Sequence, residues 1–99
     1  MKKEITFNDC SAILERVKCA AMITLSPLHI NDRLTPYLAE LADALNDVEF
    51  INVFSILNTQ GKLCFTVNKG IRNNEVLDAV CDAITRVFDA NITIANVRI

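Results

Sequence analysis

Two alternating segments separated by a short turn constrain this chain more than any other feature. Residues 48–57 are rich in β-branched and aromatic side chains, and residues 62–68 alternate between apolar and polar side chains. Residues 58–61, which lie between them, read Asn-Thr-Gln-Gly. Strand-favouring residues on both sides of a short polar turn predict a β-hairpin. The fold is therefore expected to contain an antiparallel sheet.

The length of the turn predicts which face of the hairpin is buried. A loop of two or four residues sets Ile56 opposite Leu63 and Phe54 opposite Phe65. We expect one face to turn towards the core, with Phe50, Phe54, Ile56, Leu63, Phe65 and Val67. The other face is more apolar than a solvated sheet surface needs to be, and we interpret it as a protein interface. This predicted interface consists of Ile51, Val53, Leu57, Cys64 and Thr66.

Three further segments carry apolar residues at helical spacing. In Cys10–Ala21 the stripe follows Asn8 or Asp9 as a candidate N-cap, and in Pro36–Leu45 it follows Thr35. The strongest stripe runs through residues 77–88, after Asn73 or Asn74 as a candidate N-cap. We expect an amphipathic helix in each segment.

Short alternating stretches at residues 3–7 and 92–98 predict a first and a last strand, whereas residues 23–31 lose their period and predict a loop. The expected order is β-α-α-β-β-α-β. This is an α+β fold, with an antiparallel sheet of three or four strands covered on one face by two or three helices. The sheet has three strands if residues 3–7 do not join it. The order resembles the ferredoxin-like arrangement, and a resemblance in element order alone implies no substrate or site.

Length and composition narrow the class of protein. A chain of 99 residues is expected to form a single α+β domain over residues 1–99, and an apolar fraction of 52% argues against disorder. The formal charge of −2 gives no general attraction to nucleic acid or to an anionic membrane. Lys2 and Lys3 precede Glu4 directly, which does not resemble a secretory signal, and the longest uncharged run is too short to cross a bilayer. We therefore expect a cytoplasmic protein.

The reactive residue types have structural explanations. Ser26, His29 and Asp32 lie close together in sequence, but a proline follows the serine and nothing resembles a nucleophile motif. The four cysteines are scattered without the spacing of a zinc site, and we expect buried free thiols, with Cys19 the most exposed. The sequence therefore predicts no enzyme, no metal and no cofactor.

Two polar features remain as candidate binding surfaces. A basic loop directly before the last predicted helix suits an anion or a small ligand, and it contains Lys69, Gly70, Arg72, Asn73 and Asn74. Acidic residues without an intervening cation suit docking on a basic protein, and they are Glu40, Asp43, Asp47 and Glu49.

These observations predict a regulatory or inhibitory protein that acts by protein–protein interaction. We expect a homodimer, because a single apolar patch used twice closes on itself. The alternative is a small-molecule-binding sensor domain that uses the basic loop at residues 69–74.

Overall fold

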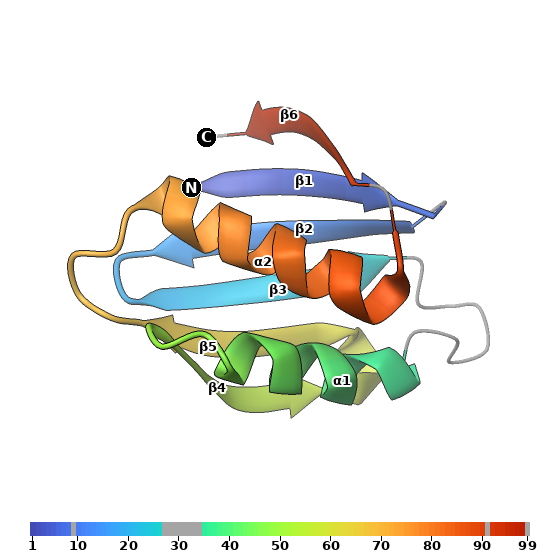
Figure 1. Ribbon diagram of the computed structural model, residues 1–99, viewed down its shortest axis with the longest axis horizontal. Coiled ribbons are helices and arrows are strands. Elements are labelled where there is room, and N and C mark those ends of the chain that lie inside the picture. The colour runs from blue at the N-terminus through green and yellow to red at the C-terminus, as the bar shows by residue number, and fades with distance from the viewer. Residues whose placement is uncertain (9, 27–34, 91, 99) are drawn as a thin grey trace.

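The computed structural model describes residues 1–8, 10–26, 35–90 and 92–98, and it contains a six-stranded antiparallel sheet with two α-helices on one face (Figure 1). The strands are β1 (Lys2–Phe7), β2 (Cys10–Val17), β3 (Ala20–Ser26), β4 (Ile51–Leu57), β5 (Lys62–Val67) and β6 (Thr93–Arg98). The helices are α1 (Thr35–Asn46) and α2 (Asn73–Phe88), and a 3-10 turn, η1 (Asn58–Gln60), joins β4 to β5. The order of the strands in the sheet is β4-β5-β3-β2-β1-β6.

The predicted α+β class and the antiparallel sheet beneath helices are confirmed, whereas the number of strands and the element order are wrong. Three strands precede α1, so the ferredoxin-like order does not hold. Residues 23–26, predicted as a loop, belong to β3, and residues 27–31 lie outside the described residues. Because β1–β2–β3 form a continuous meander, the sheet is wider than the four strands that the sequence predicted.

The helix predicted over Cys10–Ala21 is in fact the hairpin of β2 and β3. Buried Ala12 and Leu14 alternate with half-buried Ile13, which is the period of a strand. The two-residue turn requires a positive φ, and Lys18 supplies it at 57°. Because lysine takes the place that glycine usually holds, the sequence carries no turn signal there.

The other elements lie close to their predicted positions. Both later helices, the hairpin of β4 and β5, and the first and last strands are present, with shifts of a few residues at their ends. Helix α2 is terminated by Asp89, whose φ of 49° is left-handed.

A β-bulge in β4 changes the predicted register. Ile56 pairs with Leu63 as expected. An extra residue between Val53 and Ser55 shifts the pairing of the earlier part of β4 by one residue relative to the predicted register. Val53 consequently lies opposite Phe65. Since a shift of one residue exchanges the two faces of a strand, the part of β4 before the bulge turns its other side to the helices.

Both sets of predicted hairpin faces are therefore partly wrong. Ile51 is 5% exposed and belongs to the core, and Val53 packs against the core. Phe54, predicted to be buried, is 62% exposed. The prediction that Ile51 and Val53 form an open interface is overturned by the bulge.

One cluster of buried apolar residues lies between the sheet and the helices. Helix α1 contributes Leu38, Leu41 and Leu45, and α2 contributes Val76, Val80 and Ile84. The strands contribute Ile5, Leu14, Ile23, Leu63 and Phe65, among others. Because the helices bury these stripes in the core, their opposite sides face solvent with the polar residues of each helix.

Candidate functional site

The solvent side of α1 carries a stripe of carboxylates. Glu40, Asp43 and Asp47 recur at intervals of three and four residues, so they share one side of the helix and its continuation. All three are exposed. Three of the four residues predicted as an acidic docking face therefore lie together, while Glu49 is exposed in the connection to β4 and does not line the same depression.

Helix α2 presents a second acidic stripe of the same spacing. Glu75, Asp78 and Asp82 follow one another at intervals of three and four residues and are exposed, and Arg86 continues the stripe one turn further.

The two stripes border a groove between the helices. Both helices lie on the same face of the sheet (Figure 1). Two depressions of about 380 and 360 Å³ make up this groove, and both are lined by Ala44 and Arg86. The first also contains the α2 carboxylates, and the second contains the α1 carboxylates. The remaining lining residues are apolar and small or half-buried, namely Val48, Phe50, Ala79, Ala83 and Val87. We call this feature the acidic groove.

One ion pair crosses the acidic groove. Nη1 of Arg86 lies 3.9 Å from Oδ2 of Asp47, and the two side chains are 63% and 75% exposed. An exposed pair at this distance stabilises a fold by about 0–1 kcal/mol. Arg86 is the one cationic residue that lines the groove within the described part of the chain, so its six carboxylates are largely unneutralised.

The acidic stripe of α2 affects the ionisation of the Cys81 thiol. Burial raises the pKa of Cys81 above its ordinary value, and the neighbouring carboxylates of Asp78 and Asp82 raise it further. A thiol in such surroundings stays protonated at neutral pH and is a poor nucleophile. The position therefore does not resemble that of a catalytic cysteine.

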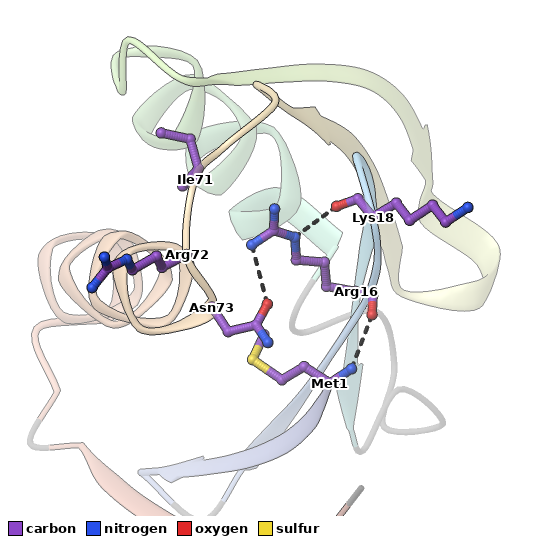
Figure 2. Close-up of a pocket in the computed structure, with 6 residues that line it drawn as sticks. All are labelled: Met1, Arg16, Lys18, Ile71, Arg72 and Asn73. Carbon is purple, nitrogen blue, oxygen red and sulfur yellow. Dashed lines mark hydrogen bonds between the residues drawn. The ribbon is translucent and has the colours of Figure 1, made fainter.

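A basic depression lies where the β2–β3 turn meets the start of α2 (Figure 2). It has a volume of about 520 Å³, and its lining is Met1, Arg16, Lys18, Ile71, Arg72 and Asn73. Of the predicted basic loop, Arg72 and Asn73 line it, whereas Lys69, Gly70 and Asn74 do not. Arg16 and Lys18 were missed because their segment was predicted as a helix.

Most of the polar groups in the basic depression are held by internal hydrogen bonds. Arg16 donates from Nε to the carbonyl oxygen of Lys18 at 2.7 Å and from Nη1 to Oδ1 of Asn73 at 3.1 Å (Figure 2). The backbone nitrogen of Arg72 donates to Oε2 of Glu75 at 2.8 Å. This last contact closes the first turn of α2 with a carboxylate, which suits the positive end of the helix dipole. Arg16 thus ties the β2–β3 turn to α2.

The apolar residues predicted as an interface are divided by the sheet. Leu57, Cys64 and Thr66 lie on the face away from the helices, because their neighbours Ile56, Leu63 and Phe65 face the helices. Phe54, Ile56 and Leu57 are exposed apolar residues of β4, the edge strand of the sheet, with Ile56 on the helix face and Leu57 on the opposite face. The sequence missed Phe54 as a surface residue because nothing in it marks the bulge.

Only some of the residues considered for catalysis and metal binding lie in the described part of the chain. Ser26 is exposed at the end of β3, and His29 and Asp32 lie outside the described residues. Cys19 is exposed in the β2–β3 turn, and the other three cysteines are half-buried and free rather than fully buried as predicted. Among the described residues there is no group of three side chains suited to a metal ion. None of the described helices combines the length and apolar character that crossing a bilayer requires.

Comparisons with models of protein families, with curated proteins and with solved structures found no match for this chain. Its function therefore has to be inferred from the geometry and chemistry of its own surfaces.

Proposed function

We propose that this chain is a non-enzymatic regulatory or inhibitory protein that acts by binding a protein partner in the acidic groove. One observation carries the proposal: six exposed carboxylates in two stripes border a floor of small and half-buried apolar side chains. Apolar floors that are rimmed by polar residues are typical of protein-binding surfaces.

The electrostatics of the groove favour a basic partner. Carboxylates concentrated on both rims create a local negative field that exceeds what the formal charge of −2 suggests. Such a field accelerates the encounter with a positively charged surface and disfavours acidic ones. A partner that uses the same basic surface to hold a nucleic acid would be inhibited by this contact.

Capture of the partner from the native cell tests this function. The tagged chain should retain a specific protein, and the variant Asp43→Asn/Asp78→Asn/Asp82→Asn should lose it. A matched control is Glu4→Gln/Glu15→Gln, which removes carboxylates from β1 and β2 on the face away from the helices. If both variants retain the same amount of partner, the acidic groove is not the binding surface.

Self-association is a separate proposal that uses another surface. Two acidic grooves repel each other, so a homodimer would instead bury the exposed apolar residues of the edge strand β4, namely Phe54, Ile56 and Leu57. The replacement Phe54→Asp should then shift the chain towards the monomer in sedimentation velocity. A monomer at all concentrations of the wild-type chain would rule the homodimer out.

A second candidate function is the binding of a small anion in the basic depression. Lys18 and Arg72 line it, and neither side chain donates one of the hydrogen bonds that hold it together. An anion at a hundred times its dissociation constant stabilises a fold by about 2.7 kcal/mol. The melting temperature should therefore rise with a phosphorylated metabolite and lose that response in Lys18→Ala/Arg72→Ala. Indifference to a broad panel of anions would exclude this function.

A further inference from the structure

We infer that the occupant of the acidic groove is an amphipathic helix of the partner, with an apolar stripe that is flanked on both sides by lysine or arginine. This inference rests on the proposed function and adds the shape and the charge pattern of the partner. Its basis is the floor of the groove, the placement of the two rims and the ion pair that crosses between them.

The floor suits a helix because three of its lining residues are alanines, and two of these, Ala44 and Ala83, are buried. Ala44 comes from α1 and Ala79 and Ala83 come from α2, so these positions place only a methyl group on the floor of the groove. Two helices that pack closely have axes about 8–10 Å apart, and small residues at the contact allow the shorter distances. A third helix can therefore lie along the groove and bury an apolar stripe against the alanines and half-buried Phe50 and Val87.

The rims suit cations on both sides of that stripe. The carboxylates of α1 stand on one wall and those of α2 on the other, each repeating at about one helical turn. Basic residues flanking the apolar stripe of a bound helix would repeat at the same spacing and meet both rows. A purely cationic coil would satisfy the rims and leave the apolar floor exposed, whereas an acidic helix would be repelled.

Arg86 competes with the incoming helix. Its guanidinium crosses the groove to Asp47 and places a positive charge where a basic partner would dock. The pair is exposed and weak, so a partner cation can replace Arg86 at Asp47. Removal of Arg86 should therefore strengthen binding, while removal of rim carboxylates should weaken it. These opposite signs distinguish docking in the groove from a general loss of structure.

Titration calorimetry with a synthetic peptide tests the inference on the full chain. The probe is a helix of about five turns with a leucine and alanine stripe flanked by lysines. Its two controls are the same peptide with glutamate for lysine and a scrambled peptide of identical composition. The wild-type chain should bind the probe and neither of the two control peptides, and its affinity for the probe should fall as salt is added.

Four variants locate the binding. Asp78→Asn/Asp82→Asn should weaken it by roughly two- to fivefold for each carboxylate removed, and Arg86→Gln should tighten it by roughly two- to fivefold. Ala79→Gln should weaken it by filling the floor, and Glu4→Gln/Glu15→Gln should leave it unchanged. The carboxylate variants in the groove change exposed residues only, so they remain informative if Ala79→Gln fails to fold.

Three results would overturn the inference: no binding of the probe, equal binding of the scrambled peptide, or affinity indifferent to the Asp78 and Asp82 substitutions. If the probe fails while capture of the cellular partner still depends on the rim carboxylates, the helical occupant is wrong and the proposed function stands. If both experiments fail, the proposed function falls as well.

Discussion

The acidic groove and the basic depression both involve α2, yet they differ in how their charged groups are used. In the basic depression, Arg16 is committed to the carbonyl of Lys18 and the side-chain amide of Asn73, so it holds the fold together. In the acidic groove, an ion pair joins Asp47 to Arg86, and both side chains are largely exposed. Charged side chains that make internal hydrogen bonds contribute to the stability of the fold. Charged side chains that are exposed to solvent remain available to bind a partner.

The largest effect on stability is expected at Arg16. The variant Arg16→Ala loses the hydrogen bond to Asn73, which connects β2 to α2, and the hydrogen bond to Lys18 within the β2–β3 turn. Together these losses should lower the free energy of unfolding by about 1–2 kcal/mol. Urea denaturation monitored by circular dichroism measures this change. The neighbouring variant Lys18→Ala, whose side chain makes neither bond, is the control and should change stability by less than about 0.5 kcal/mol. Equal losses in both would contradict the contrast between the two regions.

Glu75 belongs to both regions and should give the next largest effect. Its carboxylate borders the acidic groove and also accepts the hydrogen bond from the backbone nitrogen of Arg72. The variant Glu75→Ala should therefore destabilise the fold by about 0.5–1 kcal/mol, through the lost contact at the positive end of α2. Asp78→Ala, which borders the same groove without this hydrogen bond, should be closer to neutral in the same denaturation assay.

A smaller effect on stability is expected at Arg86. Because its pair with Asp47 is exposed, Arg86→Gln should change the free energy of unfolding by less than about 0.5 kcal/mol. Thermal unfolding of the wild-type chain and of Arg86→Gln, at low and at high salt, measures this change in stability. A loss of more than about 1 kcal/mol would mean that Arg86 is structural, as Arg16 is, and would remove the difference between the regions.

The smallest effect concerns the reactivity of Cys81. Because burial and the carboxylates of Asp78 and Asp82 raise the pKa of its thiol, alkylation at mildly alkaline pH should be slower at Cys81 than at exposed Cys19. The variant Asp78→Asn/Asp82→Asn should lower the pKa of Cys81 and modestly increase its rate of alkylation. Mass spectrometry of peptides after timed labelling follows both sites, and an unchanged rate at Cys81 would show that burial alone controls it.

The sequence predicted the elements whose patterns have one interpretation. The stripes of α1 and α2 fit only a helix, and the residues around Asn58–Gly61 fit only a hairpin. The acidic face was predicted from four carboxylates without an intervening cation. Glu40, Asp43 and Asp47 lie together because their spacing places them on one side of α1 and its continuation, whereas Glu49 falls outside that spacing.

Elsewhere the residues fit two patterns, and tertiary packing decides between them. Residues 10–21 fit a helical period through Ile13, Leu14 and Val17 and also a strand period through Ala12 and Leu14. Pairing with both neighbours favours the strands. The bulge in β4 and the positive φ of Lys18 have no glycine to mark them, so the register and the basic depression were out of reach of sequence reasoning.

The hydrogen bond from the backbone nitrogen of Val53 to Oδ1 of Asn46, at 2.7 Å, has a consequence for how the chain behaves at high concentration. Strand β4 lies at the margin of the sheet, where free amide groups invite strands of other molecules to add on and propagate into fibres. Asn46 occupies one such amide, and the backbone nitrogen of Ile51 donates to the carbonyl of Val48. The addition of a foreign strand is therefore disfavoured at the start of β4, and the stretch of β4 beyond the bulge is the part of this strand left open to it.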